Sequence, residues 1–173
     1  VGGTLQMGSS STLGSPNATL TVNPGGTLDL NGTNQGVGGL SGVTGTGMIL
    51  NNATGTVATL TVGNNVSGAT YGGMIADNTS GTGTVALTKI GTGTLSLAGA
   101  NTYTGTTTIS NGTLQVSNGG SIGSTTGTAL TLGSDTNNGQ LILGDSSGVG
   151  RATVSSITIS GTGTANAIVG GNS

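Results

Sequence analysis

The sequence contains no cysteine, histidine, glutamate, tryptophan or phenylalanine, and only 3% of its 173 residues are charged. The lack of cysteine excludes a disulfide framework and a thiolate metal site. No cluster of lysine or arginine is present, so the electrostatic signature of a nucleic-acid-binding protein is missing. No apolar run approaches the roughly 20 residues of a membrane-spanning helix. We therefore expect neither nucleic acid nor membrane insertion among the interactions of this segment.

Large side chains are almost absent as well, since Tyr71 and Tyr103 are the only aromatic residues. They could not fill a thick globular core, whereas a thin stack of similar layers needs only small and medium apolar side chains. Disordered chains combine low hydrophobicity with high net charge. Here 31% of residues are hydrophobic and the formal net charge is only -2, so the composition favours a folded, layered structure.

Short segments in which apolar and polar residues alternate recur along the whole chain. Such alternation is typical of β-strands with one face inside and the other in water. Glycine and Asn-Gly turns separate the segments, and no stretch of ten residues carries a helical apolar stripe, so we predict an all-β fold. Ile49 and Ile142 interrupt the alternation, and we interpret them as outward residues where the outer face is covered. The apolar pairs are Leu5/Met7, Leu20/Val22, Leu28/Leu30, Met48/Leu50, Leu60/Val62, Val85/Leu87, Leu95/Leu97, Leu114/Val116, Leu130/Leu132, Leu141/Leu143 and Ile157/Ile159.

Equivalent leucines recur at nearly constant spacing, for example 23 residues from Leu5 to Leu28 and 19 from Leu95 to Leu114. A repeat near 20 residues with two or three short strands is typical of one coil of a solenoid. An antiparallel sandwich is the alternative, but its core, ~10 Å thick, usually contains aromatic residues. We predict a single parallel β-solenoid over residues 1–173, with roughly seven to nine coils. Neither end has a cap, so we expect a segment of a longer chain or of an end-to-end fibre.

The best-defined stretch is 87–116, LTKIGTGTLSLAGANTYTGTTTISNGTLQV. It repeats a glycine turn and strand at Gly93-Thr94-Leu95 and Gly112-Thr113-Leu114, and holds the block Asn101-Thr102-Tyr103 between them. These residues resemble the passenger-associated β-strand repeat of bacterial autotransporters. The resemblance implies a right-handed parallel β-helix that serves as a non-catalytic stalk or fibre module of an adhesin-like protein. It also implies a place outside the cell or on the outer membrane-associated surface of a Gram-negative-type bacterium, with a surface glycan or a host or matrix component as candidate ligand.

Few side chains could carry catalysis or bind metal. Such a site requires clustered carboxylates, or a carboxylate beside a base, and the four aspartates are spread over more than a hundred residues. We interpret Asp29 as outward-facing between two leucines and the other aspartates as turn residues. The turn that begins at Asp135 resembles a calcium loop but lacks its later acidic ligand. We therefore predict no enzyme activity and no catalytic, cofactor or metal residues. Tyrosine aside, the ionisable side chains are Asp29, Asp77, Asp135, Asp145, Lys89 and Arg151.

The other conspicuous residues have structural interpretations. We expect Lys89 and Arg151 to be solvated surface charges, Tyr103 to pack over a coil edge, and Asn101 to satisfy backbone groups at a corner. Six glycosylation sequons follow from a composition rich in Asn, Ser and Thr, and no glycosylation is inferred from them. They begin at Asn17, Asn31, Asn52, Asn65, Asn78 and Asn111.

The alternative function is binding of carbohydrate or ice by outward rows of Thr, Asn and Tyr. Pairs such as Thr19/Thr21 and Thr59/Thr61 suggest it. That function requires a flat, regular array on one face, and the threonine pairs are irregularly spaced along the sequence. An enzyme would require at least two aspartate carboxyls within ~10 Å in a groove. The structural module is therefore the leading interpretation.

Overall fold

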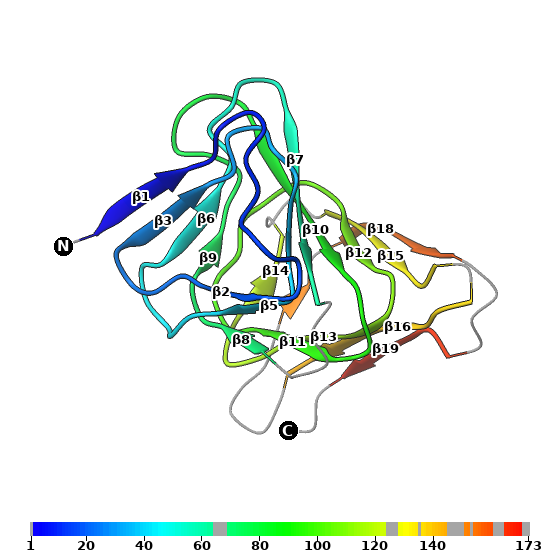
Figure 1. Cartoon of the computed structure of the whole chain (residues 1–173). Helices are drawn as coiled ribbons and strands as arrows, with labels where there is room; N and C mark the ends of the chain where they lie inside the picture. The colour runs from blue at the N-terminus through cyan, green and yellow to red at the C-terminus, as the bar shows by residue number, and fades with distance from the viewer. Residues whose placement is uncertain are drawn as a thin grey trace.

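The computed structural model describes residues 2–63, 69–123, 128–134, 136–144, 151–152, 154–160 and 165–170. Within these ranges the chain forms 19 strands and no helix, so no helix there could span a membrane. Every pairing between strands is parallel and joins equivalent strands of successive turns. The predicted all-β parallel solenoid is confirmed. Figure 1 shows the strands of successive turns stacked side by side along the coil.

Three faces run along the solenoid, and most turns contribute one strand to each face. The first face comprises β1 (Gly3–Gln6), β3 (Gly26–Asp29), β6 (Met48–Leu50), β9 (Met74–Ile75), β14 (Ser121–Ile122) and β17 (Arg151–Ala152). The second face comprises β4 (Gln35–Val37), β7 (Val57–Val62), β10 (Thr84–Lys89), β12 (Thr107–Ile109), β15 (Thr128–Leu132) and β18 (Val154–Ile159). The third face comprises β2 (Thr19–Thr21), β5 (Gly39–Ser41), β8 (Ala69–Tyr71), β11 (Thr94–Leu97), β13 (Gly112–Val116), β16 (Gly139–Leu143) and β19 (Ala167–Gly170).

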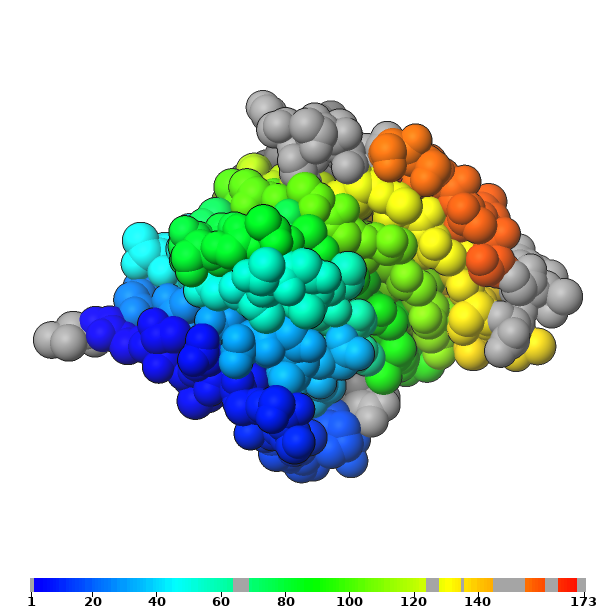
Figure 2. All heavy atoms as spheres, turned by 90° about the horizontal axis from the view of Figure 1, so that it is seen from above, coloured from blue at the N-terminus to red at the C-terminus, as the bar shows by residue number. Residues whose placement is uncertain are grey.

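The described residues make about six turns, as the six strands of the second face show. We expected seven to nine coils because the leucine spacing suggested a nearly constant turn length. Paired residues show that the length varies with the corner loops. Leu87 pairs with Thr107 after 20 residues, whereas Val57 pairs with Thr84 after 27. In Figure 2 the turns follow one another as adjacent bands from the N-terminal to the C-terminal colours.

The core consists of inward side chains aligned from turn to turn. On the third face, Leu95, Leu114 and Leu141 stand in register and are each 1% exposed or less. Burial of such a side chain contributes about 1.5–3 kcal/mol relative to leaving it in water. Each core row is only one side chain wide per turn, which explains how the fold manages without large aromatic residues.

Ile49 is not an outward residue, contrary to the interpretation from the sequence. It is fully buried, in register with Leu28 on one side and Ile75 on the other, whereas Met48 is only partly buried. Three consecutive apolar residues carry no alternation, so only the neighbouring turns determine which one faces inward. Ile142 does face outward, since its inner neighbour Leu141 lies in the core row.

Candidate functional sites

Asp29 alternates with the core residue Leu28, as the sequence suggested, but neighbouring turns cover it, and it is a buried link between three turns. It is 1% exposed. Its carboxylate accepts hydrogen bonds from Nε2 of Gln6 (3.0 Å) in the preceding turn and from the backbone N–H of Asn52 (3.0 Å) in the following one. Asn31 N–H and the Asn52 side chain add two more. Burial alone would raise the pKa of Asp29, but these donors outweigh it and hold the pKa below its ordinary value.

Asp77 performs a similar task at a later turn. Its Oδ1 accepts the backbone N–H groups of Val85 and Thr104, both at 2.9 Å, and its Oδ2 accepts the Thr104 hydroxyl at 2.7 Å. The aspartate therefore is a turn residue, as the sequence predicted, and also joins two turns. Asp29 ends β3, whereas Asp77 follows β9 two turns later. Asp135 and Asp145 lie outside the described residues, and within the described ones no three acidic, histidine or cysteine side chains gather.

Lys89 is a core residue and not the solvated surface charge that we expected. It is 1% exposed and stands in an inward row between Val62 and Ile109. Its ammonium donates to the carbonyl oxygens of Ile90 (2.5 Å), Gly91 (2.8 Å) and Asn111 (3.4 Å) at the corner that follows β10. Burial lowers the pKa of Lys89 to about 8. The side chain of Arg151 lies outside the described residues.

Asn101 satisfies backbone groups at a corner, as predicted from the sequence. Its Oδ1 accepts the N–H of Ile75 (2.8 Å) in the preceding turn. Its Nδ2 donates to the carbonyls of Gly99 (2.9 Å) in its own turn and Ser121 (2.5 Å) in the next. With 2% of its surface exposed, the amide is a buried connector of three turns.

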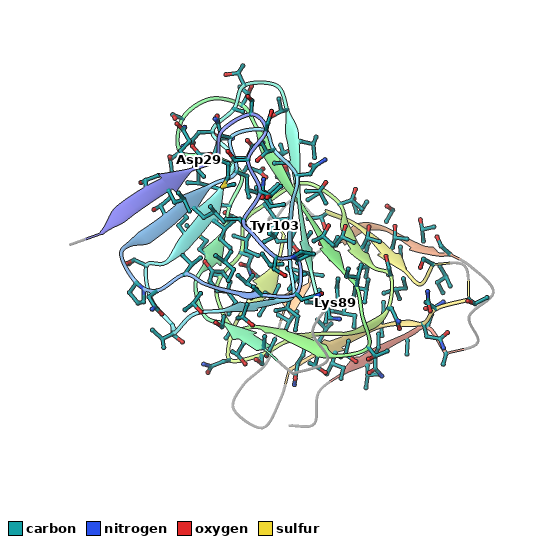
Figure 3. All side chains as sticks on the ribbon, viewed as in Figure 1. Asp29, Lys89 and Tyr103 are labelled. Carbon is teal, nitrogen blue, oxygen red and sulfur yellow. The ribbon has the colours of Figure 1, made fainter. Side chains whose placement is uncertain are left out.

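Neither tyrosine is available to a ligand. Tyr103 is fully buried, so its expected position over a coil edge is wrong; its hydroxyl bonds to the hydroxyl of Thr107 at 2.7 Å. Tyr71 is fully buried as well and donates to the carbonyl of Gly47 at 3.2 Å. Burial raises the pKa of both hydroxyls well above their ordinary value. Figure 3 shows Tyr103 within the coil, apart from the labelled Asp29 and Lys89.

Several connectors were missed by sequence reasoning. Asn51 is fully buried, accepts the N–H of Gly32 (2.8 Å) in the preceding turn and donates to the carbonyl of Thr84 (3.0 Å) in the next. Gln35 donates to the carbonyl of Ser11 at 2.9 Å. The signal that could have revealed them is an Asn, Asp or Gln recurring at the spacing of one turn beside a strand end.

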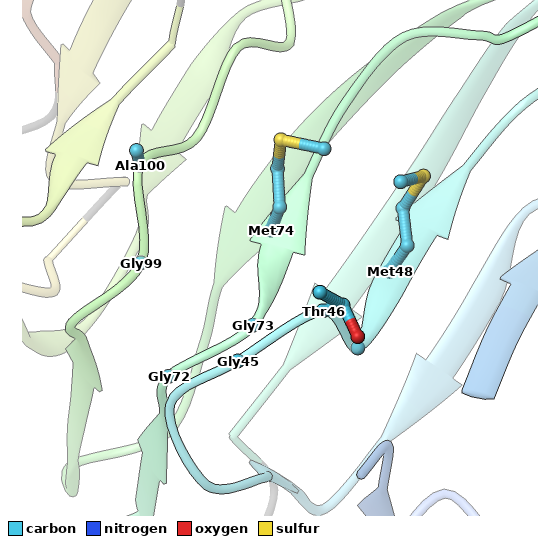
Figure 4. A pocket seen from close by; sticks show the side chains of 9 residues that line it. Gly45, Thr46, Met48, Gly72, Gly73, Met74, Gly99 and Ala100 are labelled. Carbon is cyan, nitrogen blue, oxygen red and sulfur yellow. The ribbon is translucent and has the colours of Figure 1, made fainter. Parts of the chain in front are cut away.

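A surface groove of about 260 Å³ runs across three turns where the third face meets the first. Figure 4 shows Met48 and Met74 side by side along it, and Thr46, Ala100 and glycines of the three turns complete its lining. The glycines are required by the tight corner itself: a Cβ on Gly99 would lie 1.8 Å from the carbonyl oxygen of Gly73. No titratable side chain lines the groove. It offers backbone polar groups and apolar surface, and no acid–base chemistry.

The outer side of the second face carries a column of threonines. The strand register aligns one threonine from each of five successive turns, four of them partly buried and the last exposed. The hydroxyls therefore repeat at the spacing of adjacent strands, ~4.8 Å. This order is not visible in the uneven spacing of threonines along the sequence, because the corner loops differ in length. The column comprises Thr61, Thr88, Thr108, Thr131 and Thr158.

Comparison with known proteins agrees with this architecture. Residues 87–116 match the family model described as passenger-associated-transport-repeat. The chain is 36% identical over 130 residues to the adhesin BmaC autotransporter of Brucella suis biovar 1 (strain 1330). That alignment covers 67% of this chain and 3% of the adhesin, so the chain corresponds to a small part of its relative. No solved structure matches the chain. The chain is therefore a parallel β-solenoid that carries a passenger-associated transport repeat at residues 87–116.

Proposed function

We propose that this chain is a structural module of the passenger of a bacterial surface adhesin, a non-catalytic stalk that holds other regions away from the cell. The observation that carries the proposal is the parallel stacking of strands from turn to turn, unbroken over the six strands of the second face, in a chain that contains a passenger-associated repeat. The similarity to an autotransporter adhesin supports a position at the surface of, or outside, a Gram-negative bacterium.

Hydrogen bonds from buried polar side chains hold neighbouring turns together, as a mechanical stalk requires. Asp29, Asn51, Asp77, Lys89 and Asn101 each place hydrogen bonds on a neighbouring turn. Hydrogen bonds that involve charged groups contribute about 1.5–3 kcal/mol each when buried. Separation of two turns therefore requires these bonds to break together with the ladder bonds. The charged side chains whose contacts the structure describes, Asp29, Asp77 and Lys89, are thus occupied by the scaffold.

A partner is proposed from the two ends of the stack. Inner-row residues are exposed towards both ends of the stack: Leu5 in β1 is 57% exposed, and Ile157 in β18, the last strand of the second face, is 50% exposed. Their neighbours in the same rows, Leu28 and Leu130, are buried. A further coil, from the same chain or from a second copy, would cover these residues and extend the rows. Light scattering over a concentration series of the 173-residue chain distinguishes the two: growth into rods supports stacked copies, and a constant monomer mass opposes them.

The stalk is tested in the intact surface protein. Deletion of this segment should shorten the protein seen by electron microscopy by roughly 30 Å, six turns at ~4.8 Å each, and an antibody against the segment should label unpermeabilised cells. Unchanged length contradicts the stalk, and labelling only after permeabilisation contradicts surface exposure. Loss of adhesion at unchanged length would indicate a binding module instead.

A second candidate function rests on the threonine column. A neutral, hydroxyl-bearing ligand such as a glycan could hydrogen-bond along it, whereas stacking on Tyr71 or Tyr103 is excluded by their burial. Figure 1 shows the strands of the second face fanning along the stack, a twist that disfavours a planar ice lattice as the ligand. Replacement of Thr88 and Thr108 by lysine should abolish glycan-array binding if the column is the site, with the same replacement at outward Ser96 and Gln115 as the control. Binding that survives the first pair refutes this candidate.

A further inference from the structure

Four Asn-Gly dipeptides lie within the chain, at Asn31, Asn111, Asn118 and Asn138. An asparagine followed by glycine can cyclise when the glycine backbone nitrogen, after losing its proton, attacks the side-chain carbonyl carbon Cγ. The new C–N bond closes a succinimide and the amide nitrogen leaves as ammonia. Water then opens the ring at either carbonyl, giving aspartate or isoaspartate. The reaction requires a solvent-accessible glycine N–H and a side chain that is free to turn.

The turns hold Asn31 in place. Its Nδ2 donates to the carbonyl of Met7 at 2.9 Å in the preceding turn. The N–H of Gly32, the nitrogen that would attack, donates to Oδ1 of Asn51 at 2.8 Å in the following turn. Both reacting groups are therefore occupied by neighbouring turns.

Asn111 and Asn138 are held by the ladder and the corner next to it. The N–H of Gly112 donates to the carbonyl of Asn138 at 3.1 Å and also to Oδ1 of Asn111 at 2.8 Å. The N–H of Gly139 donates to Oδ1 of Asn166 at 2.7 Å, and Oδ1 of Asn138 accepts the N–H of Ala165 at 3.1 Å. Local opening must precede attack by either glycine nitrogen.

Asn118 differs from the other three. It lies with Gly119 in an exposed two-residue turn, closed by a 2.8 Å bond from the N–H of Gly120 to the carbonyl of Ser117. Both turn residues have positive φ, 53° and 76°, as a type I′ turn requires. Among hydrogen bonds between described residues, none engages the Asn118 side chain or the Gly119 N–H. We propose that Asn118 is a site of spontaneous deamidation in the folded protein.

The modification places a carboxylate on a surface that otherwise shows little charge. Asp29 and Lys89, two of the three charged side chains in the described part of the chain, are each 1% exposed. Conversion of Asn118 to aspartate or isoaspartate adds one negative charge and changes the formal net charge from -2 to -3. The new charge projects from the corner between β13 and β14.

The test is peptide mapping of the folded 173-residue chain after incubation at mildly alkaline pH, with isoaspartate identified by electron-transfer fragmentation. Asn118 should convert at least about tenfold faster than the other three sites, because only they require local opening. In denaturant the four rates should converge. An Asn118→Gly variant, whose glycine accepts the same positive φ, should lose the fast product and keep its thermal unfolding midpoint. Conversion of Asn31, Asn111 or Asn138 as fast as that of Asn118 in the folded chain overturns the proposal.

Discussion

Lys89 makes the stability of the solenoid depend on pH in an unusual direction. Its pKa falls from 10.5 in an unfolded chain to about 8 in the folded one. The unfolded state therefore holds more protons than the folded state between pH 8 and about 10.5, and the free energy of unfolding rises with pH in that range. A shift of about 2.5 units corresponds to roughly 3 kcal/mol, of which about 2 kcal/mol is recovered between pH 8 and 10.

Tyr71 and Tyr103 set the upper limit of this rise. Their folded pKa values lie above the ordinary value of 10.0, so their contribution is complete below that pH and is lost as the pH rises beyond it. Thermal unfolding followed by circular dichroism should show a maximum in stability near pH 10. The midpoint should rise by about 4–8 °C between pH 8 and 10 for a chain of this length.

The matched variant is Lys89→Met, which keeps an unbranched apolar stem in the same row. Its unfolding midpoint should not rise between pH 8 and 10, because the titrating group is gone. It leaves the carbonyls of Ile90, Gly91 and Asn111 without the ammonium, so its stability at any single pH is less informative than the slope. An equal rise in both proteins, or a midpoint of the unaltered chain that falls between pH 8 and 10, refutes the reasoning.

Three other substitutions test the coil in the same unfolding assay. Gly99→Ala should destabilise the fold by about 3 kcal/mol or more, because the new Cβ would lie 1.8 Å from the carbonyl oxygen of Gly73. The control is Gly36→Ala, whose Cβ would meet nothing within 4 Å and which should change the free energy of unfolding by no more than about 1 kcal/mol. Equal effects of the two substitutions would contradict the tight corner at Gly99. Asp29→Ala should lower the free energy of unfolding by about 3 kcal/mol at neutral pH. This loss should become smaller as the pH falls through the depressed pKa of Asp29, because the native carboxylate is then protonated. A loss of less than about 1 kcal/mol would show that the four donors bond to water in the variant. Tyr103→Phe should lose about 1–2 kcal/mol by leaving the Thr107 hydroxyl unpaired, and a neutral result would show that this hydroxyl bonds elsewhere.

The fold could be predicted from the sequence because the alternation of apolar and polar residues that produces it is local and recurs from turn to turn. Alternation identified which residues of β11 and β13 face inward, and the register confirms Leu95 and Leu114 as partners. The number of turns was overestimated because corner loops carry no apolar pattern. The loop after Ile75 lengthens its turn without changing any strand, so the leucine spacing could not reveal it.

The polar interior could not be predicted, for a different reason. Alternation assigns a face to a polar residue by assuming that polar side chains face water. Lys89 and Thr107 occupy inward positions in apolar rows, and Asp29 is covered by neighbouring turns. What determines each case is whether donors or acceptors from the next turn reach the polar atoms, and that depends on stacking. The periodicity of the sequence indicates only where a residue lies within its own turn.

The buried polar residues also bear on how a repetitive coil finds one register. An apolar row fits equally well against any other apolar row, so near-identical turns could stack in several ways. Asn51 and Asn101 remove this ambiguity, because the buried amide of each bonds to both neighbouring turns and would lose those partners after a slip of one turn. We infer that they specify the order of turns at some expense of stability. Replacement of both asparagines by apolar residues should therefore leave a folded coil whose amide resonances are doubled, whereas a single set of resonances would show that the ladders and corners alone select the register.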